Sequence, residues 1–231
     1  MLIEIDLLIS LLKLTKDGFV SIKCVNQDVR IGLDIVRKML KKLQNAGMVY
    51  LNGATVEANS DQRLKIAVEA ASLGADVEHI SSFLRWQEFE DITSIALERN
   101  GYIATKNVRF KYAGHRWEID VVGCKKPLVL CVDCKHWQRG VHPSALRKIV
   151  EAQAERARAL AERLPSPKLK VECVKWNEAR FIPVILVLIP SRFKFYDNVP
   201  VVPVLQLQDF LFQLPSYVES LKYFTIEFSH L

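Results

Sequence analysis

The hydrophobic positions of this chain follow a helical spacing over its first part, interrupted by one short hairpin. Residues 2–14 carry leucines and isoleucines on more than one side, which predicts a buried helix. From residue 32 to residue 46 the apolar positions again recur at helical spacing, and Gly47 ends this helix. Two short apolar runs then flank Asn52–Gly53, a dipeptide that strongly favours a β-hairpin.

With a short helix expected at 25–31, the order of elements is that of a winged helix-turn-helix, which we assign to residues 1–58. The last of its helices has a basic side made of Arg37, Lys38, Lys41 and Lys42. In a winged helix these side chains would contact DNA, and the hairpin would be the wing. They also suit a solvated helix face or a protein contact, so these alternatives stay open. Two further helices are predicted over residues 59–85, which we interpret as a helical connector.

Beyond residue 85 the pattern changes to short apolar runs placed between helices. A helix is predicted from Trp86 to Asn100, and a long one from Pro143 to about Leu164. Strands are predicted at 102–112, 181–189, 201–205 and 224–228, with two more inside Gly114–Trp137 and a short helix at 208–214. This order predicts an α/β fold over residues 86–231, in which helices flank a mixed sheet. Residues 169–176 fit either another strand or an excursion.

Charge and cysteine content indicate the kind of partner and the cellular compartment of this protein. The 231 residues carry a net charge of +6 and the pI is near 9.0, which favours a polyanionic partner such as nucleic acid, although the signal is weak alone. Five cysteines, an odd number, follow an acidic N-terminus that does not resemble a signal peptide, which predicts a reducing cytoplasm. The apolar run at 181–190 is too short to cross a bilayer as a helix, so no membrane partner is expected.

The two strands inside Gly114–Trp137 carry charged residues that a purely structural strand would avoid. Asp133 and Lys135 are two residues apart, as are Glu118 and Asp120, and residues two apart share one face of a strand. If the strands pair through a turn at 125–127, the carboxylates converge beside the lysine. Carboxylate oxygens suit a hard divalent cation such as Mg²⁺.

The segments W-Q-E-F-E, N-G-Y, E-I-D-V-V-G and V-D-C-K occur in this order over roughly residues 86–205. An acid on a first helix, an Asp on one strand and (Asp/Glu)-x-Lys on the next resemble the PD-(D/E)xK nuclease superfamily. These four segments are most similar to the Mrr-type branch of the superfamily, and archaeal Holliday junction resolvases have the same order of motif residues. The resemblance implies a restriction-endonuclease-like fold, although Ile119 stands where the family's proline often precedes the Asp.

The resemblance also implies a role for each matched residue in hydrolysis of a DNA phosphodiester bond. Asp120 and Asp133 would ligate Mg²⁺ or Mn²⁺, with a backbone carbonyl near Cys134, and Lys135 would position or deprotonate the attacking water. Glu90 would complete the metal's shell. Many such nucleases are dimers, so a homodimer is possible on this resemblance. A protein that keeps the fold without cleavage, either a DNA-binding protein or a winged-helix transcription regulator, is the alternative.

Several residues near this motif have competing interpretations. Glu88 and Asp91 compete with Glu90, and Glu118 is better explained as a solvated acid than as another ligand. Gln153, on the inward side of the long helix, would help to position substrate. Arg139 and Arg147 would line a DNA channel, with Trp137 and Lys148. Cys131 and Cys134 form a C-x-x-C pair, but strand parity directs them to opposite faces and disfavours zinc.

Overall fold

A computed structural model describes residues 2–135, 142–164, 166, 169–188 and 192–228. The chain forms two compact units, residues 1–89 and residues 90–231. The helices predicted as a connector lie within the first unit, and helix α6 runs across the boundary. The limits of the proposed winged-helix domain stay a prediction. No helix in the described ranges is long and apolar enough to cross a membrane.

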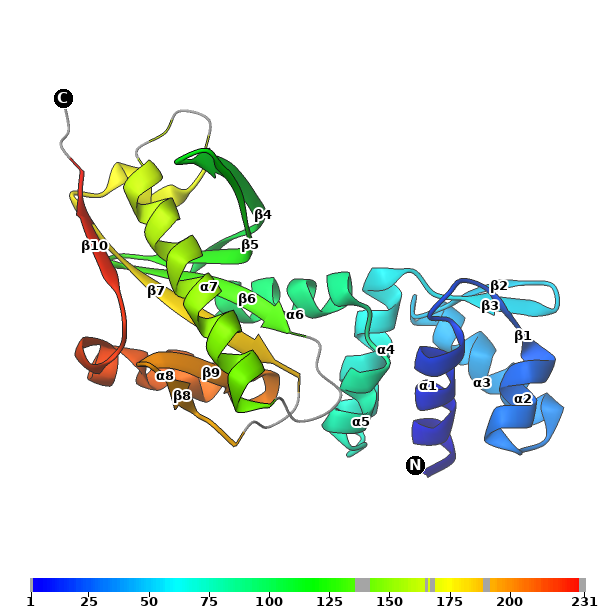
Figure 1. The fold of residues 1–231 in the computed structure, drawn as a ribbon. Coiled ribbons are helices and arrows are strands. Elements are labelled where there is room, and N and C mark those ends of the chain that lie inside the picture. Colours follow the sequence, from blue (N-terminus) through cyan, green and yellow to red (C-terminus); the bar gives the residue numbers. More distant parts are fainter. Residues whose placement is uncertain (1, 136–141, 165, 167–168, 189–191, 229–231) are drawn as a thin grey trace. The chain divides into compact units, whose positions relative to one another are not determined.

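The first unit contains helices and a small sheet in the expected order (Figure 1). Its elements are α1 (Leu2–Leu14), β1 (Val20–Ser21), α2 (Ile22–Val29), α3 (Leu33–Asn45), β2 (Tyr50–Asn52), β3 (Thr55–Glu57), α4 (Ser60–Ser72), α5 (Val77–Ser82) and the start of α6 (Trp86–Arg99). The strands pair in the order β1-β3-β2, and the hairpin predicted around Asn52–Gly53 is confirmed. Four leucines of α1 are almost completely buried, namely Leu7, Leu8, Leu11 and Leu12. Their burial explains why this helix has apolar residues on several sides.

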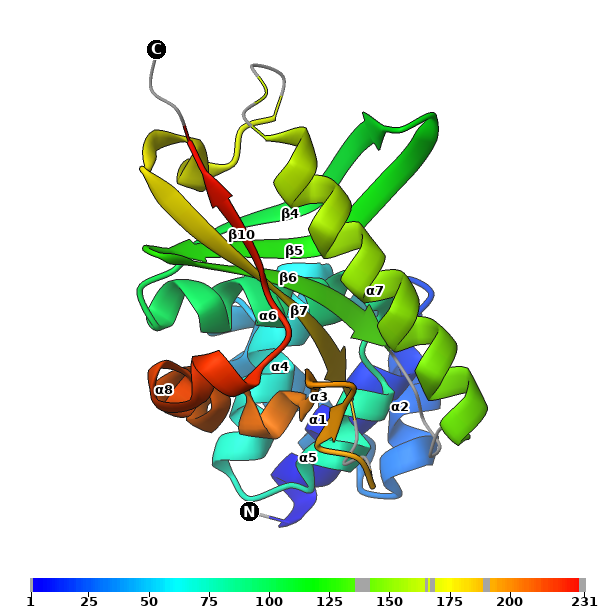
Figure 2. The same cartoon turned by 60° about the vertical axis from the view of Figure 1, so that its left-hand side comes forward.

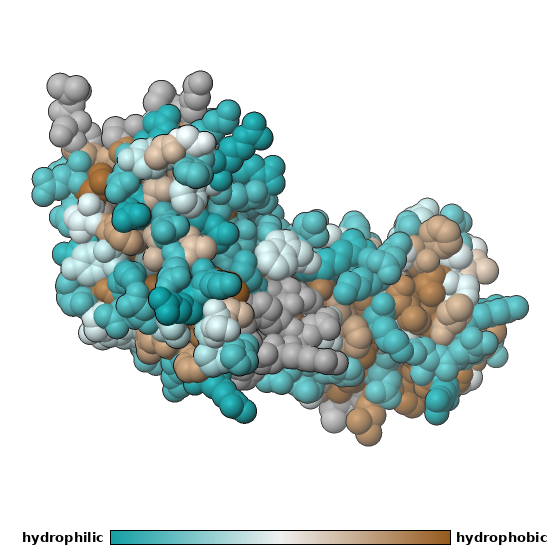
Figure 3. Space-filling view, in the orientation of Figure 1, coloured by the Kyte–Doolittle hydropathy of each residue, from teal (hydrophilic) through white to brown (hydrophobic). Residues whose placement is uncertain are grey.

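The surface of the first unit also exposes several large apolar side chains. These are Leu2, Ile3, Phe19, Ile35, Tyr50 and Val68. Hydrophobic colouring is correspondingly more extensive over this unit, at the right of Figure 3, than over the face of the second unit that carries α7 (Pro143–Arg163). The outward side of α7 is mostly charged, as the helical spacing of its apolar residues predicts.

The second unit is built on a mixed sheet, as predicted (Figure 2). Its strands are β4 (Ile103–Tyr112), β5 (His115–Lys125), β6 (Leu128–Lys135), β7 (Glu178–Val187), β8 (Phe195–Tyr196), β9 (Val199–Pro203) and β10 (Phe224–Glu227). The order is β4-β5-β6-β7-β9-β8, and β10 pairs with the first residues of β7. β4, β5 and β6 are antiparallel, whereas β6, β7 and β9 are parallel. The central strand β7 is apolar on both faces because helices cover both faces of the sheet.

Helices α6 and α7 lie on opposite faces of this sheet (Figures 1 and 2). On the α7 side, Ala157 and Leu160 pack with Val129, Cys131 and Phe181 in the main core. On the α6 side, a Cβ atom added at Gly123 would lie 3.0 Å from Leu97 Cδ1. A side chain at position 123 would therefore force the Leu97 side chain to shift, which favours the glycine in E-I-D-V-V-G.

The remaining elements are short, and they include the parts that the sequence left open. Residues 169–176 contain a 3-10 turn, η1 (Glu172–Lys175), and not an additional strand. The C-terminal region has η2 (Val204–Gln206), α8 (Leu207–Tyr217) and η3 (Val218–Ser220), and the strand predicted at 224–228 is confirmed as β10. The two-residue strand β8 was not predicted, because so short a strand leaves no alternation in the sequence.

Candidate active site

The candidate site begins where strands β5 and β6 separate. Their antiparallel pairing runs from Lys125–Leu128 to Val121–Val132, and the next two residues are Asp120 and Asp133. At this point the backbone N–H of Cys134 donates a hydrogen bond to Asp120 Oδ2, at 2.8 Å. The side chain of Asp120 therefore takes the place of a backbone acceptor on β5. This exchange places the two aspartates on neighbouring strands at the opening.

Strand β4 also departs from regular pairing opposite Asp120. The β4–β5 register passes from Lys106–Val121 to Val108–Ile119, and Asn107 stands opposite Asp120 between these pairs. Asn107 has φ of 54°, a left-handed conformation that asparagine tolerates better than most residues. The β4–β5 hairpin bends away from the rest of the sheet (Figure 2). Asp120 thus lies at a position where the regular pairing of β5 is interrupted on both sides, with β4 and with β6.

The bend changes which residues of β5 share a face. Ile119 and Val122 belong to the same core cluster under α7, so the alternation shifts by one residue between them. Glu118 extends to solvent and pairs with Arg109, with 2.9 Å between Oε1 and Nη2, whereas Asp120 turns toward β6. The shift lies between Ile119 and Val122, after Glu118, so the expectation that Glu118 and Asp120 project together stays a prediction. Its alternative, a solvated Glu118, agrees with this geometry.

Asp133 is a buried carboxylate between two cations. Its Oδ1 accepts hydrogen bonds from Lys135 Nζ and Arg156 Nη1, both at 2.9 Å, and only 3% of the residue is exposed. Lys135 Nζ also lies 2.7 Å from Oδ2. This contact lacks hydrogen-bond geometry, so within the described residues Oδ2 accepts no hydrogen bond. The prediction that Asp133 and Lys135 project together is confirmed by these contacts.

Arg156 is a residue of this cluster that the sequence did not indicate. Arg156 lies one helical turn after Gln153 on α7. The Nε2 of Gln153 donates a hydrogen bond to the Cys131 carbonyl at 2.6 Å. Arg156 Nη1 also lies 3.3 Å from Gln153 Oε1. Gln153 is inward-facing, as predicted, and its spacing to Arg156 is the one signal by which this arginine could have been found.

The charges of three carboxylates act on the thiol of Cys134. Burial raises the pKa of this thiol, a hydrogen bond with Thr93 opposes the rise, and the negative charges of Asp120, Glu90 and Asp133 add to it. Burial likewise raises the pKa of Asp120; the Cys134 N–H opposes this rise, and the charge of Asp133 adds to it. The two aspartates are therefore close enough to repel each other.

Glu90 lies on the same side of the sheet as this thiol, since Thr93 on α6 contacts Cys134 with 3.6 Å between Oγ1 and Sγ. The competing acids of this helix face other partners. Glu88 is in a buried ion pair with Arg63, and Asp91 pairs with Lys106. Of these three acids, Glu90 is the one whose charge acts on the Cys134 thiol, and its place in the site stays a prediction.

The two cysteines of the C-x-x-C pair lie on opposite faces of β6. Cys131 belongs to the core cluster under α7, whereas Cys134 contacts Thr93 of α6. The parity expected for a strand is confirmed, and one ion cannot bind both thiols from these positions.

The donors at this site fit a hard divalent cation with few protein ligands. The charge of Asp133 contributes to raising the pKa of Asp120 on the neighbouring strand. A cation bound by both carboxylates would offset this repulsion. Over the described ranges, no three His, Cys, Asp or Glu side chains are close enough to hold an ion together. Mg²⁺ commonly binds through one or two carboxylates and completes its shell with water and substrate phosphates, so Asp120 and Asp133 suffice as a starting set.

The predicted DNA contacts lie on exposed helix surfaces. Arg37, Lys38, Lys41 and Lys42 are all exposed on α3. Arg147, near the start of α7, is exposed and pairs with Glu151, at 2.7 Å. Arg139 lies outside the described residues, as does Trp137.

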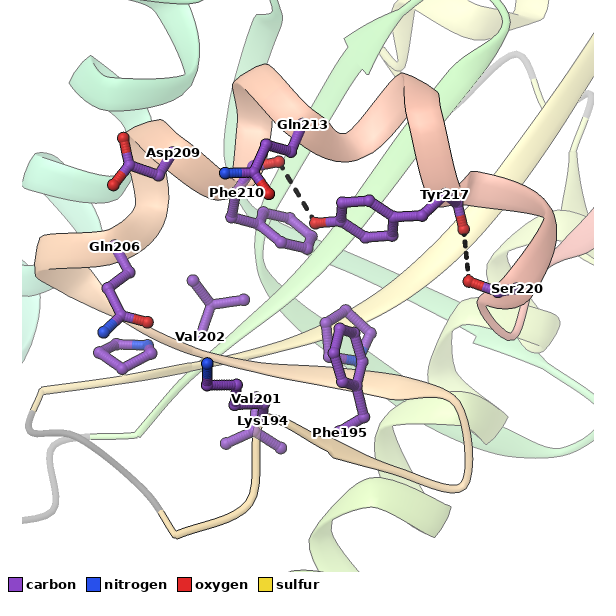
Figure 4. A pocket seen from close by; sticks show the side chains of 12 residues that line it. Lys194, Phe195, Val201, Val202, Gln206, Asp209, Phe210, Gln213, Tyr217 and Ser220 are labelled. Carbon is purple, nitrogen blue, oxygen red and sulfur yellow. Dashed lines mark hydrogen bonds between the residues drawn. The ribbon is translucent and has the colours of Figure 1, made fainter.

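A separate pocket of about 640 Å³ lies between α8 and the β8–β9 edge of the sheet (Figure 4). Aromatic side chains of Phe195, Phe210 and Tyr217 line it, and Gln206, Asp209 and Gln213 project from α8 and the turn before it. None of the predicted catalytic residues lines this pocket.

Comparison with known proteins agrees with the family that the motif resembles. Residues 82–161, which include Glu90, Asp120, Asp133 and Lys135, match the Mrr catalytic family, described as restriction endonuclease. An uncharacterized protein of Archaeoglobus fulgidus is 32% identical over 136 residues, which make up 58% of this chain and 95% of that protein. The chain belongs to the Mrr-type restriction endonuclease family. The predicted family and its restriction-endonuclease-like fold are thereby confirmed.

Two solved structures share lower similarity with this Mrr-type chain. A protein of unknown function, AF1548, is 17% identical with a TM-score of 0.30, over 42% of this chain and 44% of its own. Protein VC1899 from Vibrio cholerae is 12% identical with a TM-score of 0.44, over 94% of this chain and 52% of its own. This chain thus spans about half the length of these structures.

Replacement of Asn107 by valine is expected to destabilise the fold by about 1–2 kcal/mol and to lower any activity that depends on Asp120, because a β-branched residue disfavours the left-handed conformation. Asn107→Gly, which permits this conformation, should retain both properties. Thr105→Val, on the same strand, is the matched control. Urea denaturation and a DNA-cleavage assay would measure the effects. A valine variant that equals the control in both assays would show that Asn107 does not hold the bend.

Proposed function

We propose that this Mrr-type chain is a divalent-metal-dependent DNA endonuclease that hydrolyses phosphodiester bonds. The observation that carries this proposal is the meeting of Asp120, Asp133 and Lys135 at the point where β5 and β6 separate. Two acids and a lysine in this order are the residues that the family resemblance assigns to catalysis. Their immediate surroundings combine buried negative charge with two cations, which suits chemistry on a phosphate group.

Each residue of the cluster has a distinct proposed task. Asp120 and Asp133 would hold the metal, with Glu90 nearby. When bound, Mg²⁺ or Mn²⁺ lowers the pKa of water and polarises the scissile phosphate. Lys135 Nζ lies 2.7 Å from Asp133 Oδ2 and would orient the attacking water by donating a hydrogen bond to it. Arg156, which donates to Asp133 and is partly exposed, would offer its remaining N–H groups to the phosphate oxygens.

DNA would also be held by the N-terminal unit. The cations of α3 are exposed, and the hairpin β2–β3 follows this helix as a wing would. We therefore propose a winged helix that docks duplex DNA through Arg37, Lys38, Lys41 and Lys42. A homodimer would supply one catalytic site for each strand of a duplex. These features are compatible with a role in restriction, recombination or repair.

The full chain should cut DNA in the presence of Mg²⁺ or Mn²⁺ and lose this activity in excess EDTA. We would incubate it with supercoiled plasmid, branched duplexes and single-stranded DNA, and follow the products on denaturing gels. A parallel preparation of an Asp120→Asn variant controls for contaminating nuclease. Binding to the same DNA in EDTA should persist, since binding needs no hydrolysis.

Two outcomes would overturn the proposal. Binding without cleavage of any of these substrates, at any metal concentration tested, would favour a non-catalytic DNA-binding protein. Cleavage that continues unchanged in EDTA would show that a divalent metal is not needed.

A further inference from the structure

Beyond the bend at Asn107, the β4–β5 hairpin has two chemically different faces. One face carries Val108, Phe110 and Ile119, which are buried in the core under α7, and the half-buried Trp117, which packs against that core. The opposite face carries four exposed charged residues, Arg109, Lys111, Arg116 and Glu118. They form two cross-strand pairs, Arg109 with Glu118 and Lys111 with Arg116. We call these four residues the hairpin face.

The hairpin face is positively charged. Arg109 and Glu118 form an ion pair, but 71% of the arginine side chain stays exposed and its other N–H groups can bind a second anion. Lys111 and Arg116 stand directly opposite each other. Like charges in opposite positions destabilise a sheet, so their pairing suggests an external anion. A surface hollow of about 550 Å³ is lined by Arg109, Lys111 and Arg116 of the hairpin, and Arg163 of α7 also lines it.

This face continues directly from the candidate active site. The Arg109–Glu118 pair comes two residues before Asp120 on β5, and the Lys111–Arg116 pair two residues earlier again. Two residues of an antiparallel strand span about 6.8 Å. This is the scale of one backbone step in an extended nucleic-acid strand. The charge of Glu90 also reaches Arg109, because it contributes to raising the pKa of this guanidinium after the larger effect of Glu118.

We propose that the hairpin face is a nucleic-acid backbone subsite that binds the phosphates next to the one at Asp120 and Asp133. This inference rests on the proposed function for the identity of the partner as DNA. Arg109 would contact the first neighbouring phosphate, and Lys111 with Arg116 the second. The contacts carry no base information, so they position the strand in the catalytic site and do not select a sequence.

Salt dependence of DNA binding tests this subsite without requiring cleavage. Each phosphate neutralised by a cation contributes about 0.9 to the slope of log K against log salt concentration for duplex DNA. The triple variant Arg109→Gln, Lys111→Gln, Arg116→Gln removes the contacts to two phosphates and should therefore reduce the slope by about 2. Fluorescence anisotropy with a labelled duplex, in EDTA and at NaCl concentrations from low to moderate, would measure it. Arg109→Lys and Arg116→Lys, which keep the charge, should retain most of the slope.

The matched control removes the same number of charges elsewhere on the second unit. Lys126→Gln, Lys175→Gln, Lys222→Gln changes the exposed cations of the β5–β6 turn and of η1 and a half-buried cation in the segment before β10. Its slope should equal that of the wild type. If the hairpin variant keeps the wild-type slope, or if the control loses as much, the subsite is excluded.

The outcome for the subsite is independent of the outcome for catalysis. A reduced slope in the hairpin variant, together with no cleavage by the wild type, would support the subsite and contradict the proposed endonuclease activity. Metal-dependent cleavage with an unchanged slope would do the opposite. Circular dichroism of each variant, compared with the wild type, would verify that a lost slope reflects lost contacts in a folded chain.

Discussion

Asp120→Asn should lower the rate of DNA cleavage by about 10³-fold, because a bound metal is worth several kcal/mol of transition-state stabilisation. The asparagine has nearly the same shape, and its carbonyl oxygen can still accept the hydrogen bond from the Cys134 N–H. The substitution removes the negative charge and one anionic oxygen. The loss should therefore lie in the rate and in the metal requirement, whereas stability changes little. Single-turnover cleavage at several Mn²⁺ concentrations would separate these effects.

Glu227→Gln is the matched control for this substitution. It removes an equally negative side chain from β10 of the same sheet, where Glu227 is exposed. We expect a change of no more than a few-fold in cleavage. Equal losses in the two variants would show that negative charge on the sheet, and not a ligand at Asp120, controls the rate. Wild-type cleavage by Asp120→Asn would remove this residue from the site.

Glu88→Gln should destabilise the first unit by about 3–5 kcal/mol, since it leaves a buried arginine without its counter-ion. Glu88 and Arg63 are both completely buried, and Arg63 Nε lies 2.7 Å from Glu88 Oε1. The guanidinium also donates to the carbonyl groups of Leu12 and Phe83, at 2.7 Å each. One arginine thus links α1, the end of α5 and the first turn of α6 within this unit.

Asp28→Asn provides the comparison, because it breaks a partly exposed pair with Lys13 in the same unit. Such pairs contribute about 0–1 kcal/mol, so its midpoint in urea should move little. The two-unit chain need not unfold in one step, and amide exchange of α1 and α4 would report the first unit directly. Glu88→Gln with a wild-type midpoint and wild-type exchange would show that the buried pair contributes little to stability.

The sequence predicted most of the sheet and helices because each one has a complete local signal. β7 is a continuous apolar run, α7 has apolar residues at helical spacing, and the β2–β3 hairpin follows an Asn-Gly dipeptide. The order of charged residues on β5 and β6 was sufficient to name Asp120, Asp133 and Lys135. Strand parity also placed Cys131 and Cys134 on opposite faces, as observed.

Strand parity fails between Ile119 and Val122, which belong to one core cluster although they are three residues apart, because β5 bends there. No residue is inserted there, so the sequence has no gap or extra residue to mark the bend. The left-handed conformation of Asn107 on the neighbouring strand accompanies it. An asparagine within a basic strand is compatible with a regular, unbent strand. Only the pairing of β4 with β5 shows that the strand bends at Asn107.

The chain by itself determined the family, the type of fold and three residues of the candidate site, because these depend on residue identity and on spacing along one element. Tertiary structure decided which acids and cations meet. It engaged Glu88 with Arg63 and left Glu90 near Cys134, and it brought Arg156 from α7 to Asp133. Such contacts join residues 23 or more positions apart. They depend on how helices pack on the sheet, which no local pattern specifies.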